Sequence, residues 1–297
     1  MACVLHHWWI PLFIRRMFTP GYNLEPRILY GKGVTIVPAN HCHLEYIIVG
    51  GGGAGGSIEV ISGGCGAGGG GRGEVITGCI SVTPGERITY SVGAGGRGQP
   101  NNINAPIAPG DNGEDSSFTI GSRTFTAPGG KGGLASDFAN IDTINNGKGG
   151  ECGGGGGGGG MFIGEYMGAI GGSKGQGEPG ANGTTGSINY GGVGGKGGNG
   201  ISSKRSPIFS GMNGIGGHGG SNCMSNREGS EFGGGGGGGA GGLGASNIAI
   251  RGESPDLMSS GAGQGGTGYG AGGGAASRNE KSRGGNGAPG TIVFIFT

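Results

Sequence analysis

The sequence predicts a mostly irregular and β fold: a bundle of polyglycine-II helices with short β-strands and hairpins, and little or no α-helix. Three observations lead to this class. Glycine occupies 88 of the 297 positions and proline 13. The glycines are gathered in rows, as in the unbroken run at residues 153–160. Each glycine inside a helix costs about 1 kcal/mol relative to alanine, which excludes ordinary helices across most of the chain.

Glycine rows need a core of an unusual kind. Glycine brings no side chain to bury and loses more backbone freedom on folding than any other residue. A polyglycine-II row has three residues per turn and no internal hydrogen bonds, so its N–H and C=O groups all point outward. We therefore expect hydrogen bonds between rows to form the core. A surrounded row must be nearly pure glycine, whereas peripheral rows have room for side chains at two positions in three.

Short apolar segments between the rows predict strands. Residues 44–49 (LEYIIV) predict a buried strand, and residues 291–297 (TIVFIFT) predict the last one. Residues 74–92 predict a β-hairpin about the turn TPGE, because Pro-Gly supplies turn chemistry between two β-branched arms. Residues 117–126 predict a second hairpin about a Gly-Ser turn. Further glycine rows are predicted at residues 63–73, 147–160, 168–200, 233–244, 261–274 and 284–290.

The chain is divided at residue 44. Residues 1–44 contain few glycines and hold Trp8, Trp9 and Phe13. As a free segment they would expose an apolar patch, so they either dock on a partner or pack on the chain's own strands. Residues 45–297 form the predicted glycine-rich domain with its loops.

The stretch YIIVGGGGAGG raises the question of a dinucleotide site. An apolar strand running into G-x-G-x-x-G (Gly50, Gly52, Gly55) is typical of a Rossmann fold. That fold needs a helix directly after the glycines to hold the pyrophosphate. Here the β-branched run SIEVIS follows, and then another glycine row. The pattern favours a glycine row over a nucleotide site.

Charge and cysteine usage exclude several classes. The net charge of +1 gives no reason to expect a nucleic-acid partner. No apolar run approaches the length of a membrane helix, so we expect no membrane insertion. Neither a secretory signal nor C-x-x-C spacing is present, so we expect no zinc site and a reducing folding compartment. Whether the six cysteines stay reduced is left open.

No group of residues predicts catalysis. The five histidines lack a nucleophile or carboxylate partner in sequence. His41 and His43 flank a cysteine, but neighbours on a strand point to opposite faces and make a poor metal site. Glu114–Asp115 is interpreted as a solvated turn. We therefore expect no enzyme activity, no catalytic residue, no metal and no cofactor.

Six pieces, in this order, carry a family resemblance: YIIVGGGGAGG, SVTPGERITYSVGAGGRG, EDSSFTIGSRTFTAPGGKGG, ECGGGGGGGG, FGGGGGGGAGG and GGNGAPGTIVFIFT. They span about residues 44–297. In this order they resemble the glycine-rich domain of bacteriophage tail-fibre and receptor-binding proteins, including tail-fibre-tip adhesins. The resemblance implies polyglycine-II rows beside short strands, with a host receptor contacted by the loops between rows.

The resemblance also implies partners and site residues. The expected partners are a bacterial cell-surface receptor, an outer-membrane protein or a glycan, and a tail-fibre or other virion protein bound through the N-terminus. The expected location is the virion, after folding in the host cytoplasm. The loops fall near residues 134–146, 161–167, 201–213, 221–232 and 245–260. Their apolar candidates for receptor contact are Phe138, Phe162, Tyr166, Phe209, Met224 and Phe232. The candidates for fibre attachment are Trp8, Trp9 and Phe13.

Two other function classes fit the same composition. A structural, self-assembling fibre or extracellular filament subunit would use open backbone groups on outer rows to pair between subunits. An extracellular binding module or an ice-binding protein would use the flat side of a bundle, although the charged, irregular loops disfavour an ice face. A homo-oligomer and a single copy capping a fibre are both compatible with the sequence.

Overall fold

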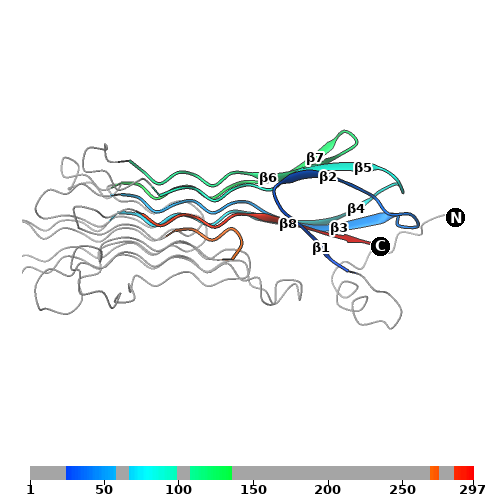
Figure 1. The fold of residues 1–297 in the computed structure, drawn as a ribbon, viewed down its shortest axis with the longest axis horizontal. Coiled ribbons are helices and arrows are strands. Elements are labelled where there is room, and N and C mark those ends of the chain that lie inside the picture. Colours follow the sequence, from blue (N-terminus) through cyan, green and yellow to red (C-terminus); the bar gives the residue numbers. More distant parts are fainter. Residues whose placement is uncertain (1–24, 58–66, 99–107, 136–267, 274–283) are drawn as a thin grey trace, which may run out of the picture.

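The computed structural model describes residues 25–57, 67–98, 108–135, 268–273 and 284–297. These residues form strands in two antiparallel sheets, and none of them is helical. Figure 1 shows the strands packed together at one end and extended glycine rows continuing from them along the long axis. The predicted fold class is confirmed.

The two sheets have four strands each, and every pairing is antiparallel. The first contains, in spatial order, β1 (Arg27–Leu29), β8 (Thr291–Phe296), β3 (His43–Val49) and β4 (Val75–Ser81). The second contains β2 (Lys32–Ile36), β5 (Arg87–Ser91), β6 (Ser116–Ile120) and β7 (Arg123–Ala127). The sheets lie face to face, with the second sheet above the first in the view of Figure 1.

The two apolar strands predicted from LEYIIV and TIVFIFT are β3 and β8, and they pair at the centre of the first sheet. Tyr46 lies opposite Phe294 in the register. All of β8 is buried on both faces, which explains why its sequence is continuously apolar instead of alternating. Strands β1 and β2 lie before residue 44, and the division of the chain at that residue stays a prediction.

The hairpin predicted over residues 74–92 is wrong in its pairing. Both arms are strands, β4 and β5, but β4 pairs with β3 in one sheet and β5 pairs with β2 in the other. The turn itself is present, since the N–H of Glu86 donates to the C=O of Thr83 at 3.0 Å and Gly85 has φ +81°. Turn chemistry fixes a local reversal, whereas the partner of each strand is set by longer-range packing. The segment is therefore an arch between two sheets.

The second hairpin is confirmed. Strands β6 and β7 pair directly, with Phe118 opposite Phe125 and Ile120 opposite Arg123. The turn needs glycine because Gly121 adopts φ +55°, which residues with a Cβ rarely do.

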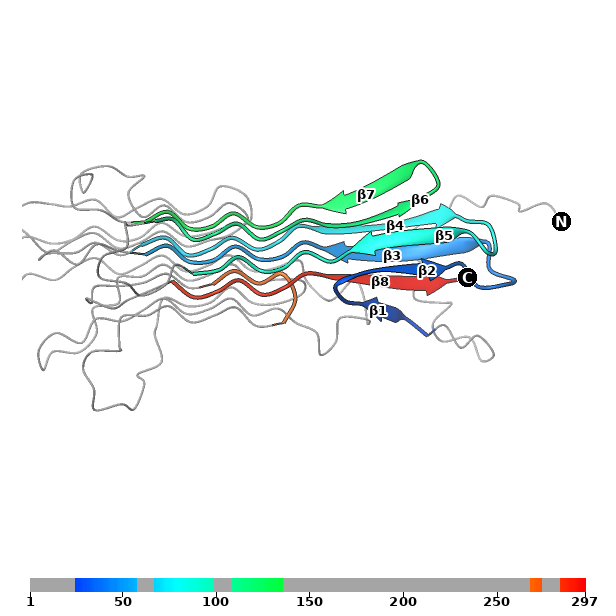
Figure 2. The same ribbon diagram turned by 45° about the horizontal axis from the view of Figure 1, so that its top comes forward.

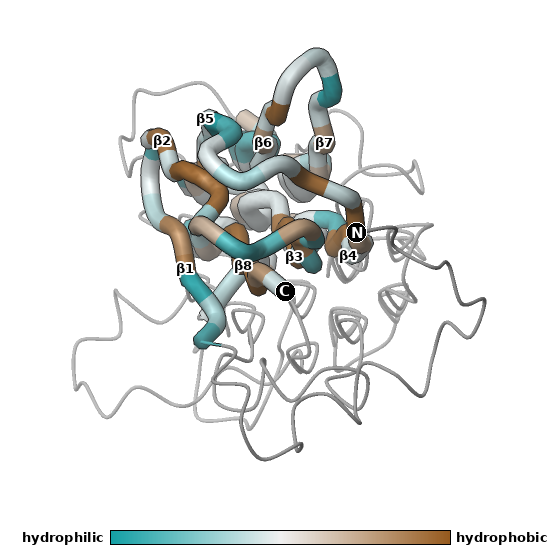
Figure 3. The backbone as a smooth tube through the Cα atoms, turned by 90° about the vertical axis from the view of Figure 1, so that its right-hand side faces the viewer, coloured by the Kyte–Doolittle hydropathy of each residue, from teal (hydrophilic) through white to brown (hydrophobic). Residues whose placement is uncertain are grey.

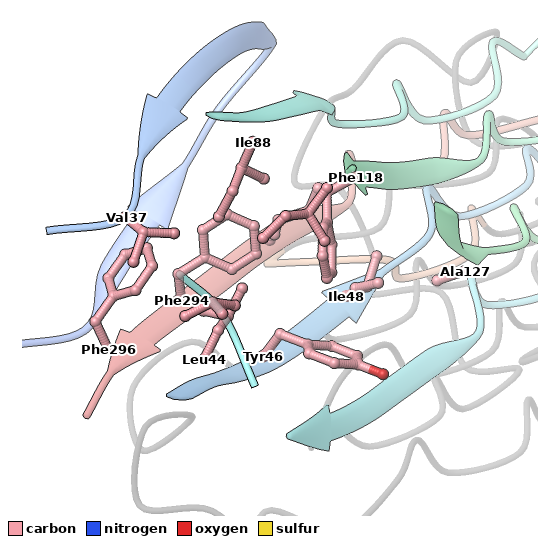
Figure 4. Packing of buried hydrophobic residues seen from close by; sticks show 12 residues of the cluster. Val37, Leu44, Tyr46, Ile48, Ile88, Phe118, Ala127, Phe294 and Phe296 are labelled. Carbon is pink, nitrogen blue, oxygen red and sulfur yellow. The ribbon is translucent and has the colours of Figure 1, made fainter. Parts of the chain in front are cut away.

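An aromatic cluster fills the space between the sheets (Figure 4). Phe118 lies at its centre, with ring centroids 5.1 Å from Tyr46, 4.8 Å from Phe125 and 5.0 Å from Phe294. Such edge-to-face and offset contacts add to the burial of apolar area. Burial also raises the pKa of the Tyr46 hydroxyl, with a further contribution from Cys79. This sandwich anchors the strand ends from which the glycine rows begin.

Candidate functional site

Residues 50–57, which follow β3, form the central row of the bundle. Successive N–H groups point in three directions in turn, so residues three apart donate to the same neighbouring row. Gly50 and Gly53, for example, both donate to residues 67–74, at 2.9 and 2.8 Å. The three rows that accept from the central row are residues 67–74, 108–115 and 284–290. This repeat of three is the signature of polyglycine II.

Three further rows donate to the central row and complete its surroundings within the described residues. They are residues 92–98, 128–135 and 268–273. Gly96 donates to the C=O of Gly52 at 2.8 Å and Gly130 to that of Gly51 at 2.7 Å. The six rows also bond to one another in a closed ring, in the order 67–74, 128–135, 108–115, 92–98, 284–290 and 268–273. The described rows therefore pack hexagonally, with one row inside six.

The close approach of the rows excludes Cβ atoms from most of the central row. A Cβ at Gly51, Gly52 or Gly53 would lie within 3.0 Å of backbone atoms in three different neighbouring rows. Ala54 is accommodated, and it is fully buried. The prediction that a surrounded row must be nearly pure glycine is confirmed.

The G-x-G-x-x-G spacing belongs to this lattice. Gly50, Gly52 and Gly55 lie in the central row, and residues 51–57 continue it as extended backbone where a Rossmann fold would begin a helix. Their N–H groups are already bonded to the C=O groups of neighbouring rows. They are not arranged to cradle a pyrophosphate.

Peripheral rows carry side chains on the surface turned away from the centre. In residues 128–135, the exposed positions Pro128, Lys131 and Leu134 recur every third residue, and the glycines between them are buried or half-buried. Residues 108–115 contain only two glycines, three positions apart. This confirms that outer rows tolerate side chains at two positions in three.

Some of these side chains take the place of a missing neighbour. Asp115 Oδ1 accepts from the N–H of Gly129 at 2.8 Å, and Asn112 Oδ1 accepts from the N–H of Gly132 at 2.9 Å. Two similar bonds run from Gly98 to Asn286 Oδ1 at 2.8 Å and from Ala94 to Glu114 Oε2 at 3.3 Å. We call Asn112, Glu114, Asp115 and Asn286 the row caps. They occupy N–H groups that an additional row would otherwise accept.

The row caps contradict the turn predicted at Glu114–Asp115, and none of them was identified from the sequence as a row cap. Glu114–Asp115 is not a turn: it lies at the end of a row, and both carboxylates accept backbone hydrogen bonds. The sequence signal that would have found the caps is the spacing of three shared by Asn112 and Asp115, in step with the spacing of the two glycines in their row.

A tyrosine pair joins the bundle to the sandwich. Tyr269, in row 268–273, packs against a buried cluster of the first sheet formed by Ile47, Val49 and Val293. Its hydroxyl lies 3.0 Å from that of Tyr30, which stands between β1 and β2. This hydrogen bond, helped by partial burial, raises the pKa of Tyr269 to about 12. The contact holds the returning chain against the strands.

The rows direct the chain to the end of the bundle that lies away from the sandwich. Rows that follow a strand run outward, and rows that precede a strand run back (Figures 1 and 2). Ser57 meets Ala108 there through a hydrogen bond of 2.7 Å, and Gly68 donates to Leu134 at 3.0 Å. The chain leaves the described bundle after Ser57, Gly98, Ala135 and Gly273.

The predicted contact residues lie outside the described residues. Those for a receptor, Phe138, Phe162, Tyr166, Phe209, Met224 and Phe232, belong to the segment 136–267 that follows row 128–135. Those for fibre attachment, Trp8, Trp9 and Phe13, belong to residues 1–24. Their proposed roles therefore stay predictions.

The described residues contain no group of three or more His, Cys, Asp or Glu side chains placed to hold a metal ion. His41 Nδ1 lies 2.9 Å from the C=O of Ala39, and His43 belongs to β3 opposite Ser81. In the same part of the chain, no helix is long and apolar enough to cross a membrane.

Comparison with known proteins identifies a family for the chain. The model of a glycine-rich domain family matches residues 30–297, which is most of the chain and includes every described row. A comparison with curated proteins found no match. Since the family match runs from Tyr30, directly after β1, to the end of the last strand, the chain belongs to the glycine-rich domain family.

Proposed function

We propose that the protein is a receptor-binding protein of a bacteriophage virion, a tail-fibre tip adhesin that recognises the bacterial cell surface through loops on a rigid polyglycine-II scaffold. The observation that carries this proposal is the polarity of the molecule. Strands gather at one end, and the outward rows deliver the chain to the other (Figure 2). An adhesin needs this separation between an attachment end and a recognition end.

The bundle suits such a role because it is stiff and chemically plain. Each central N–H is bonded to another row, and the glycines offer no side chain to react or to bind. Recognition then belongs to segments between rows, where binding residues on a rigid scaffold are usually found. The aromatic candidates bring large contact area at low conformational entropy cost.

The proposed partners are an outer-membrane protein or a glycan of the host at the loop end, and a tail-fibre or other virion protein bound through Trp8, Trp9 and Phe13. The proposed location is the virion. This role requires no enzyme activity and no cofactor.

The alternative is a self-assembling fibre or extracellular filament subunit. It needs outer rows with backbone groups open to another chain. The row caps argue against lateral growth on the described surface, because Asp115, Asn112, Asn286 and Glu114 already accept from the outward N–H groups.

Cell binding tests the proposal. Labelled protein is measured on intact cells of a panel of bacterial strains, in competition with phage adsorption where a phage is known. Strain-specific, saturable binding that blocks adsorption supports an adhesin. Alanine variants of the six aromatic and methionine candidates should reduce binding at one or more positions without lowering the melting temperature. Lys131→Ala, on the exposed side of a row, is the matched control and should bind as wild type. Filaments with no binding to any strain would favour the structural alternative.

A further inference from the structure

Exposed apolar side chains in the described residues are concentrated at one edge of the sandwich. The described residues expose four large apolar side chains, and three of them lie at this edge: Tyr30 (62%), Val34 (46%) and Ile36 (58%). Val34 and Ile36 belong to β2, which is an edge strand of the second sheet, and Tyr30 lies two residues before this strand. Figure 3 shows β1 and β2 together on one side of the sandwich and β4 and β7 on the other.

The apolar character belongs to this strand and not to the sheet surface around it. Val34 pairs with Thr89 of β5, which pairs with Thr119 of β6, which pairs with Thr124 of β7. Across the outer face of this sheet, from β2 to β7, one apolar side chain is therefore followed by three threonine hydroxyl groups. Threonine is an ordinary choice for the exposed face of a strand, whereas exposed valine and isoleucine on an edge indicate contact with another surface.

The backbone of β2 is also oriented for pairing. Gly31 accepts from Val92, and Val37 donates to Glu86, so the odd-numbered residues bond toward β5. In an antiparallel ladder the alternate residues direct their N–H and C=O groups to the opposite side. Lys32, Val34 and Ile36 therefore present backbone groups at an edge with which no described strand pairs.

The other three edges are polar or short, as is usual where pairing is avoided. Strand β7 exposes Arg123 and two threonines, and the Arg123 guanidinium reaches across to the C=O of Ser81 at the end of β4. Strand β4 exposes Thr77 and Cys79. Strand β1 has three residues. Among the strands that the structure describes, only β2 combines unpaired backbone groups with exposed apolar side chains.

We propose that β2 is a self-association edge, at which a second copy of the chain adds its own β2 in antiparallel orientation. A two-fold axis through Val34 places Val34 opposite Val34 of the second copy, and Ile36 opposite Lys32. No like charges then face each other, and the apolar stem of Lys32 covers Ile36. The two second sheets join into one continuous sheet across the axis.

The geometry of this pair is compatible with a free loop end. Strand β2 runs roughly along the long axis of the molecule, so antiparallel pairing directs the two bundles away from each other (Figure 2). Two strands of five residues bury little area compared with the roughly 1,200–2,000 Å² of stable interfaces. The dimer is accordingly weak, and it forms as protein concentration rises.

Analytical ultracentrifugation of the full chain over a wide concentration range tests the proposal. Wild type should shift from the monomer mass toward twice that mass. Val34→Pro removes the outward N–H and leaves the ladder to β5 intact, because proline is tolerated on an edge strand whose N–H faces outward. Val34→Lys places two like charges at the axis. Both variants should stay monomeric, whereas Thr89→Lys, the neighbour of Val34 on β5, should dimerise as wild type.

A melting transition measured for each variant establishes that the variant is folded. If Val34→Pro does not fold, Val34→Lys alone tests whether the dimer depends on this edge. A wild type that stays monomeric at every concentration overturns the proposal. So does a dimer that persists in a folded Val34→Pro or Val34→Lys, or one that Thr89→Lys abolishes. Cell binding is measured separately, so failure here does not bear on the proposed adhesin role.

Discussion

Moving one methyl group by one residue in the central row is expected to destabilise the protein strongly. The variant G53A/A54G has the same composition as wild type and keeps one alanine in the row. Ala54 is fully buried in a place that accepts its methyl group. Gly53 has no such space, because a Cβ there would lie within 3.0 Å of the C=O of Lys131 and the N–H of Gly132.

The loss in free energy of unfolding follows from the atoms that surround the Cβ of an alanine at position 53. The Lys131 C=O accepts from Gly71 at 2.8 Å, and Gly130 and Gly133 hold the same row to the centre at 2.7 and 2.9 Å. Displacing the row weakens about two hydrogen bonds, each worth about 1 kcal/mol. Overpacking adds about 1–3 kcal/mol. Losing the Ala54 methyl adds about 0.8 kcal/mol. The expected total is about 4–6 kcal/mol, a large part of the ~5–15 kcal/mol stability of a typical domain.

Thermal and denaturant unfolding measure this difference. The swap variant should melt about 10 °C below wild type. Ala54→Gly alone is the matched control and should lose about 1 kcal/mol, since it removes a methyl group without introducing a clash. If the swap variant melts with the Ala54→Gly control, the rows do not approach as closely as described, and the lattice argument fails.

Three further predictions concern single contacts. Asp115→Ala removes the acceptor of the Gly129 N–H and should lower the free energy of unfolding by about 1 kcal/mol, whereas Asp115→Asn, which keeps an acceptor, should stay near wild type in the same denaturant titration. The raised pKa of Tyr269 means that the folded state disfavours the tyrosinate: stability should be complete below pH 10 and fall as pH rises through about 12. Tyr30→Phe removes the hydrogen bond and should lower that pKa toward 10, seen by ultraviolet titration against Tyr269→Phe; an unmoved titration would contradict the assigned cause. Phe118→Ala should cost about 3–5 kcal/mol because it empties the centre of the aromatic cluster, and a small loss in denaturant unfolding would mean that the sheets pack elsewhere.

The sequence by itself determined the type of strands β3 to β8, whereas strands β1 and β2 and the rows at 92–98, 108–115 and 128–135 were not predicted. The apolar runs of β3 and β8, the β6–β7 turn at Gly121, and the glycine rows follow from local chemistry. An eight-residue row without Cβ atoms has few ways to form a core except by backbone bonding. The candidate contact residues, from Phe138 to Phe232, were selected by residue type and loop position alone. Because they lie outside the described residues, they stay predictions.

Tertiary structure alone decided which elements meet. The arch between β4 and β5 carries an ordinary turn sequence, and only the competition of β2 and β3 for partners separates the two strands. Which row lies at the centre depends on six neighbours drawn from distant parts of the chain. The row caps and the Tyr30–Tyr269 contact depend on the same assembly. A hydrogen bond between rows does not depend on the identity of the side chains, because every residue other than proline carries the same N–H and C=O groups. Residue types therefore specify that rows form, and only the packed lattice specifies their order.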